Sequence, residues 1–113
     1  MEGEGGEGMI VSGRNNGSPD NRTGAGYGIR LSKEDRDRYF RREWSSVEIE
    51  LESGEVVEVR LSNSFWKGCV ELRSSKIGRW MLEKGYAPWS KGNPPKFKLT
   101  PVGERKFKLR NID

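Results

Sequence analysis

The sequence predicts an α+β fold that is mainly antiparallel β, a small seven-stranded barrel with two short helices at or beside its ends. Two observations carry this prediction. Short segments in which apolar and polar side chains alternate recur along the chain. Only two segments combine a helix-capping residue with a helical pattern. The 113 residues are enough for one domain, and a hydrophobic content of only 32% limits that domain to one small core.

The N-terminal part of the chain is polar and rich in glycine. Residues 1–8 (MEGEGGEG) predict a flexible tail, so that a single domain spans residues 9–113. Residues 9–11 are a short apolar run and predict the first strand. Residues 12–26 form a long loop rich in Gly, Asn and Ser, a composition that fits either continued disorder or a functional loop.

The middle of the chain gives the clearest elements. Residues 27–31 (YGIRL) predict a strand, and Ser32 stands at the N-cap of a helix that runs to about Phe40. In residues 47–61, apolar and charged side chains alternate on both sides of a Ser53-Gly54 turn, which predicts a hairpin with one buried face. Its outer face carries glutamates and would repel a phosphate backbone, so any nucleic-acid site is expected elsewhere.

The next stretch contains a break, a strand and the second helix. Residues 62–68 (SNSFWKG) interrupt the alternation and predict a loop. The strand predicted over 69–73 begins with Cys69, which we expect to be buried. Ser74 or Ser75 then caps a helix over 76–84, which ends at Gly85.

The C-terminal part predicts two lysine-rich strands, 96–99 and 105–109. Their alternation places four apolar side chains on one face, namely Phe97, Leu99, Phe107 and Leu109. The other face carries a lysine ladder, which we define as Lys96, Lys98, Lys106 and Lys108. Such a ladder is typical both of a nucleic-acid surface and of ordinary protection of a sheet edge, and the residues leave both open.

The composition excludes several classes of function. The chain has no histidine and a single cysteine, so it lacks the residues for a histidine-based catalytic triad, for a Cys- or His-based metal site and for an intrachain disulfide. No apolar run is long enough to cross a membrane, and no secretory signal is present. We therefore expect an intracellular, non-enzymatic protein without a cofactor, nuclear in a eukaryote or cytoplasmic in a microbe. The residues leave its oligomeric state open.

The charge distribution favours a polyanionic partner. Residues 1–26 carry four acidic and two basic side chains, whereas residues 27–113 carry nineteen basic and thirteen acidic ones, a net charge of +6. The isoelectric point of the chain is about 9.4. A basic domain of this size is typical of nucleic-acid binding, although a charged surface that only keeps the protein in solution can have the same net charge.

One block of the sequence is Ile29-Arg30-Leu31-Ser32-Lys33 with the following helix, which ends in Arg38-Tyr39-Phe40, and another covers the elements predicted over residues 47–85. Together these two blocks resemble the B3 DNA-binding domain, found in plant transcription factors and in the recognition domains of some restriction endonucleases. The first block is similar to the strand, corner and first helix of that family, with Ser32 in place of the usual Pro. The second block runs from residue 47 to residue 85 and is similar to the hairpin, aromatic loop, strand and second helix of the family. The family's Gly-Asp before a final strand is absent, and Gly92-Asn93-Pro94-Pro95 stands in roughly that place.

The resemblance implies an open pseudobarrel that grips the major groove of double-stranded DNA with two polar segments. The first would be residues 14–27 and the second residues 62–68. Candidates for base contacts or for shaping the two segments are Arg14, Asn15, Asn16, Arg22, Asn63 and Trp66, because Arg and Asn suit bidentate reading of guanine and adenine. Candidates for phosphate contacts are Arg30, Lys33, Arg60 and Lys67. Ser62 and Ser64 are further hydrogen-bond donors in the second segment.

Two other functions remain open from the sequence. RNA or single-stranded nucleic acid could bind the basic β surface, which requires Phe97 and Phe107 to be exposed for stacking. A protein-interaction module could use an exposed Phe65-Trp66 pair, with the basic charge serving only solubility.

Overall fold

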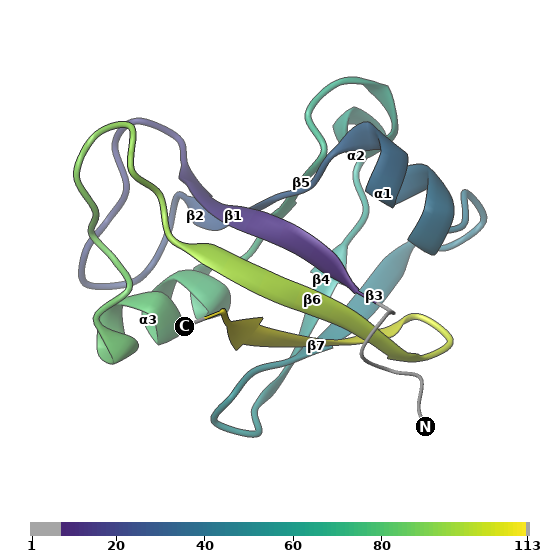
Figure 1. Ribbon diagram of the computed structural model, residues 1–113. Coiled ribbons are helices and arrows are strands. Elements are labelled where there is room, and N and C mark those ends of the chain that lie inside the picture. Colours follow the sequence, from purple (N-terminus) through teal and green to yellow (C-terminus); the bar gives the residue numbers. More distant parts are fainter. Residues whose placement is uncertain (1–7, 113) are drawn as a thin grey trace.

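Seven strands form one sheet in the computed structural model, which describes residues 8–112 (Figure 1). They are β1 (Met9–Asn15), β2 (Tyr27–Arg30), β3 (Ser46–Glu50), β4 (Val56–Arg60), β5 (Glu71–Arg73), β6 (Lys96–Gly103) and β7 (Lys106–Asn111). Their order in the sheet is β4-β3-β7-β6-β1-β2-β5, and every neighbouring pair is antiparallel except β3 and β7. The two edge strands, β4 and β5, lie close together without pairing, so the sheet is a nearly closed barrel. The predicted α+β, mainly antiparallel fold is confirmed.

The alternation in the sequence places the core inside this barrel. The hairpin of β3 and β4 pairs Val47 with Val59 and Ile49 with Val57, and all four side chains are buried. The four apolar side chains predicted to share a face on β6 and β7 are also buried, namely Phe97, Leu99, Phe107 and Leu109. The prediction of inward and outward faces therefore holds for these strands, since one residue in two points inward along each of them.

Two of the three helices lie at the predicted places. The helix α1 (Lys33–Tyr39) starts at Ser32, whose hydroxyl accepts a hydrogen bond from the backbone N–H of Asp35. The helix α3 (Ser75–Lys84) starts at Ser74 and ends at Gly85, which adopts the left-handed conformation with φ of 82°. Both caps satisfy backbone groups that a helix end otherwise leaves unpaired. Within residues 8–112, no helix has the length and apolar character needed to cross a membrane.

A third helix, α2 (Asn63–Lys67), replaces part of the loop predicted over 62–68, so the prediction of two helices was wrong. The segment begins with Ser-Asn-Ser, residue types that favour caps and turns over helix interiors, and this led to the loop prediction. The helical turn is held by tertiary contacts. The Phe65 side chain is fully buried, and the Arg36 guanidinium in α1 donates a hydrogen bond to the Phe65 carbonyl oxygen.

Two strand boundaries also correct the sequence predictions. β1 continues to Asn15, so the connection predicted over 12–26 begins only at residue 16. The extension comes from pairing with β2, in which Ser12 lies opposite Arg30 and Asn15 opposite Tyr27. β5 begins at Glu71, which leaves Cys69 outside the strand and exposed, not buried as predicted. The flexible tail predicted over residues 1–8 lies outside the described residues, apart from Gly8.

The connection between β1 and β2 is fastened to α3 by a close approach of two backbones. Gly24 adopts a φ of 84°, and its carbonyl oxygen would be 2.1 Å from a Cβ atom added at Gly78 of α3. In the other direction, a Cβ added at Gly24 would lie 2.3 Å from the Ser75 carbonyl oxygen. Only residues without side chains allow this packing, so Gly24 and Gly78 together fix where the connection lies.

Candidate nucleic-acid interface

The outward face of β1, β2 and β5 carries three arginines around one carboxylate. Arg14 lies opposite Gly28 in the register of β1 and β2, and Gly28 in turn lies opposite Arg73 of β5. In the neighbouring row Arg30 lies opposite Glu71. We call this set the arginine face and define it as Arg14, Arg30, Glu71 and Arg73.

The Glu71 carboxylate contacts all three guanidinium groups. Its Oε2 accepts a hydrogen bond of 2.8 Å from Arg30 Nη2 and lies 3.0 Å from Arg14 Nε. Its Oε1 accepts a hydrogen bond of 3.1 Å from Arg73 Nε and lies 3.1 Å from Arg73 Nη2. The Glu71 side chain is only 1% exposed, whereas those of Arg30 and Arg73 are 61% and 56% exposed. The negative charge of Glu71 is therefore buried, while the positive charges of Arg30 and Arg73 are exposed to solvent.

Gly28 makes room for this cluster. It lies between Arg14 and Arg73 in the sheet, on the same outward face. A Cβ atom added there would meet the Leu72 carbonyl oxygen at 2.5 Å and the Arg73 Cα at 3.0 Å. A side chain at this position would also stand between the two arginines. The missing side chain therefore allows both of them to reach the same carboxylate.

The arginines determine the pKa of Glu71. Burial on its own would raise the pKa of this carboxyl, but the hydrogen bond from Arg30 and the charges of Arg14 and Arg73 together bring it below the ordinary value of 4.5. The ionised form is therefore the one that the folded protein stabilises.

This lowered pKa predicts a pH-dependent contribution to stability. A carboxyl with a depressed pKa stabilises the fold above its ordinary pKa, and the contribution is lost as pH falls through the lowered value. We expect wild type to be more stable than Glu71→Gln at neutral pH and the difference to shrink below the ordinary value of 4.5. Urea unfolding of both proteins, from neutral pH to below pH 4.5, measures this difference in the free energy of unfolding. A difference that stays constant at every pH would contradict the prediction.

The β1–β2 connection flanks one end of the arginine face, and its two predicted asparagines shape the backbone. Asn15 Oδ1 accepts a hydrogen bond from the Gly17 N–H, and Asn16 Oδ1 accepts one from the Ser18 N–H, both at 2.9 Å. Bidentate reading of adenine needs both the oxygen and the nitrogen of the amide. Of the two roles predicted for Asn15 and Asn16, the geometry therefore favours shaping of the segment.

Arg22 lies further along the same connection, in a turn organised by Asp20. The Asp20 carboxylate accepts hydrogen bonds from the backbone N–H groups of Arg22 and Thr23, and these bonds lower the pKa of Asp20. The Arg22 side chain itself is exposed. Beside this connection lies the segment before β6, drawn in green in Figure 1. Between the two is a hollow of about 740 Å³, whose lining includes Arg14, Arg30, Trp89 and Lys91.

The helix α2 flanks the other end of β5, because β5 runs from α2 toward α3 (Figure 1). Its Trp66 is half-buried and lies beside two cations, with the Arg36 and Arg42 guanidinium carbons 5.7 and 5.1 Å from its ring centroid. Phe65 packs edge-on against the same ring. These contacts hold the Trp66 ring in place within the second segment.

The other predicted residues of the second segment are polar groups on the surface of α2. Ser62 is the N-cap but makes no capping hydrogen bond, since its hydroxyl pairs with that of Ser64 at 2.8 Å. Asn63 and Lys67 are exposed at the two ends of the helix. With Phe65 buried beneath, the fully exposed side chains of this short helix are polar.

Two predicted phosphate contacts lie on other elements. Lys33 is exposed at the first position of α1. Arg60 is exposed at the end of β4 and lines a separate hollow with Ser45, Ser46 and Glu58. Among the described residues 8–112, no hydrogen bond or ion pair joins either of them to the arginine face.

The sequence prediction missed Gly28, Glu71 and Arg73. Glu71 alternates with the buried Val70 and Leu72, a pattern that does not distinguish it from an ordinary outward-facing residue of a strand. A charged residue followed two positions later by an opposite charge, Glu71 and Arg73, is a sequence signal of an ion pair on one face of a strand. The partners Arg14 and Arg30 gave no such signal, since they come from distant parts of the chain.

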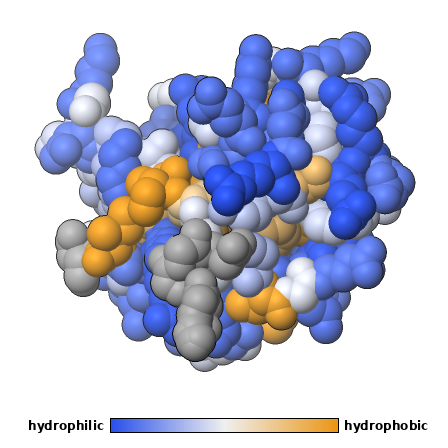
Figure 2. Space-filling model, turned by 45° about the vertical axis from the view of Figure 1, so that its right-hand side comes forward, coloured by the Kyte–Doolittle hydropathy of each residue, from blue (hydrophilic) through white to orange (hydrophobic). Residues whose placement is uncertain are grey.

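Three of the four aromatic residues on which the two alternative functions rested are buried, and the fourth is half-buried. Phe97 and Phe107 are 0% and 1% exposed, so these rings offer no platform for stacking a base. Phe65 is fully buried, which leaves only half-buried Trp66 of the pair expected to contact another protein. Figure 2 shows a face that is mostly hydrophilic, with hydrophobic side chains in small separate areas.

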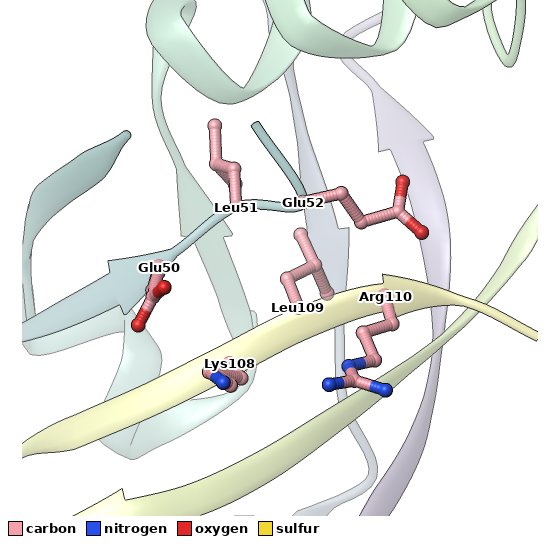
Figure 3. Close-up of a pocket in the computed structure, with 6 residues that line it drawn as sticks. All are labelled: Glu50, Leu51, Glu52, Lys108, Leu109 and Arg110. Carbon is pink, nitrogen blue, oxygen red and sulfur yellow. The ribbon is translucent and has the colours of Figure 1, made fainter. Parts of the chain in front are cut away.

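The lysine ladder and the hollow beside it mix both signs of charge. The pairing of β3 with β7 sets Glu48 beside Lys106 and Glu50 beside Lys108. A hollow of about 220 Å³ lies at this place, and Figure 3 shows the charged side chains of Glu50, Glu52, Lys108 and Arg110 that line it. The Glu52 carboxylate is already used, because it accepts hydrogen bonds from the Tyr86 hydroxyl and the Asn111 N–H. Carboxylates beside the lysines weaken the attraction of this surface for a polyanion.

Comparison of the chain with protein-family models, with curated proteins and with solved structures finds no match. Function is therefore inferred from the residues of this chain.

Proposed function

We propose that this protein binds double-stranded DNA with sequence preference, without catalysis, through the arginine face and the two polar segments that flank it. The observation that carries the proposal is the display of Arg30 and Arg73, both more than half exposed, on one face of the sheet. The planar guanidinium group is the side chain best suited to the paired acceptors of guanine and of phosphate. An intracellular DNA-binding domain of this kind needs no cofactor.

The placement of the flanking segments supports the same proposal. The β1–β2 connection and α2 lie at opposite ends of the antiparallel pair of β2 and β5, so each can follow one side of a groove (Figure 1). The B3 domains that the chain resembles use two such segments, for transcriptional regulation or for recognition by a restriction enzyme. Both segments are ordered by their own contacts, which lowers the entropy lost on binding.

A salt titration with duplex DNA tests this function. The probe is a pool of duplexes with a randomised central segment, and the sequences that the protein retains are then measured singly. With about four phosphates neutralised on binding, the affinity is expected to fall about a hundredfold between about 50 and 200 mM salt. Single-stranded DNA of the same sequences is the control and is expected to bind more weakly. Negligible binding of every duplex at low salt would overturn the proposal.

A further inference from the structure

Glu71 is a carboxylate on the face that we propose for DNA, where a negative charge opposes binding. The neighbouring residue Leu72 points into the core, so Glu71 points to the outer side of β5. Its side chain is nevertheless 1% exposed, and its ion pairs in residues 8–112 are with Arg14, Arg30 and Arg73. The arginines themselves therefore cover the carboxylate.

Neither an advantage in stability over an apolar cluster nor simple attraction of DNA explains this arrangement well. Apolar side chains often replace a buried ion pair with no loss of stability, because burying charges is costly. A carboxylate close to a phosphate backbone also lowers the attraction of the surface for DNA. What the carboxylate supplies is a fixed orientation, since both of its oxygens hold guanidinium groups in defined directions.

The held arginines keep part of their donors for a ligand. Arg30 uses Nη2 on the carboxylate, and Arg73 uses Nε and Nη2. The side chains of Arg30 and Arg73 remain 61% and 56% exposed. That of Arg14 is only 18% exposed, and it contacts the carboxylate from β1. A guanidinium has five N–H donors, so groups remain on both exposed arginines after Glu71 is satisfied.

We infer that Glu71 is a positioning residue, which fixes Arg30 and Arg73 so that they read paired acceptors in the major groove, as O6 and N7 of guanine present them. The inference rests on the proposed function and deepens it. A fixed guanidinium loses little side-chain entropy on binding, and it rejects a base whose acceptors lie elsewhere. The retained sequences are then expected to share a guanine at a fixed position.

The test compares two substitutions that remove the same charge. Glu71→Gln removes the carboxylate from the arginine face, whereas Glu55→Gln removes one from the exposed turn between β3 and β4. Charge alone predicts that both variants bind duplex DNA slightly more tightly than wild type. Positioning predicts that Glu71→Gln binds the best retained sequence about tenfold more weakly and discriminates less against replacement of the shared guanine. If the slope of log affinity against log salt concentration is nearly the same for Glu71→Gln and wild type, the loss of affinity comes from orientation and not from a lost phosphate contact.

A second variant and a measurement without DNA keep the inference testable if Glu71→Gln is unstable. Arg30→Lys preserves the charge on a residue that is mostly exposed. Introduced into wild type, it is expected to abolish the preference for guanine. Introduced into Glu71→Gln, it is expected to reduce that preference little further, because the arginine is already unfixed. In the free protein, the Nε–H resonance of Arg73 is expected to be sharp in wild type and broadened in Glu71→Gln. Equal binding by the Glu71→Gln and Glu55→Gln variants, with wild-type binding intact, overturns the inference and leaves the proposed function standing. Failure of wild type to bind any duplex overturns both.

Discussion

Replacing Arg30 and Arg73 together with alanine is expected to lower the affinity for the preferred duplex about a hundredfold, because each arginine contact with a base contributes about 1–3 kcal/mol. Both side chains are more than half exposed, so they are available to the ligand. Fluorescence anisotropy with the best retained duplex measures the change. Thermal unfolding of the same variant checks that the fold persists, since Glu71 keeps only Arg14 as a partner.

The matched control is the pair Lys96→Ala and Lys106→Ala, which removes the same charge from exposed positions of the lysine ladder. We expect it to weaken binding only slightly, through the loss of long-range attraction. If the lysine pair costs as much affinity as the arginine pair, the DNA site lies on β6 and β7. If the arginine variant unfolds, the charge-preserving pair Arg30→Lys and Arg73→Lys replaces it. That pair is expected to lose sequence preference while it retains non-specific binding.

The second large effect concerns the anchor of the β1–β2 connection. Gly78→Ala is expected to lower the free energy of unfolding by about 1–3 kcal/mol, because overpacking forces the surrounding backbone to shift. The added Cβ would lie 2.1 Å from the Gly24 carbonyl oxygen and 2.7 Å from the Tyr27 Cβ. Neither neighbour is the end of a flexible side chain, so the clash can be relieved only if the backbone itself moves.

Urea unfolding measures this change, and Gly68→Ala provides its control. Gly68 has a φ of −140° and nothing within 4 Å of an added Cβ, so alanine is expected to change the free energy of unfolding by less than about 0.5 kcal/mol. Under the proposed function, Gly78→Ala also weakens duplex binding, since it displaces one of the two flanking segments. Equal stability of the two variants would show that α3 and the connection are not packed as described.

Much of the fold follows from patterns between neighbouring residues. The alternation in β3, β4, β6 and β7 identifies their inward faces, and the caps at Ser32, Ser74 and Gly85 mark helix ends. Each pattern works locally. A capping hydroxyl bonds to N–H groups two or three residues away, and a strand exposes every second side chain to the same side.

The elements that the sequence missed depend on partners far away in the chain. The turn of α2 forms although its residues favour a loop, because Phe65 is buried and Arg36 binds its carbonyl oxygen. β1 continues through the polar segment to Asn15 because β2 supplies the opposing hydrogen bonds. Local propensity is a weak prediction in both cases, since tertiary contacts contribute more than the preference of a few residues.

By itself, the sequence determined an α+β barrel of seven strands, its core residues, and the absence of the histidines that many catalytic and metal sites require. It also marked Arg14 and Arg30 as candidates for a polyanion site. Only the tertiary structure decided that these two arginines and Arg73 meet on Glu71. The bond from Arg30 to Glu71 joins residues 41 positions apart. Burial of that carboxylate is a property of the assembled sheet, because strands from separate parts of the chain supply the charges that cover it.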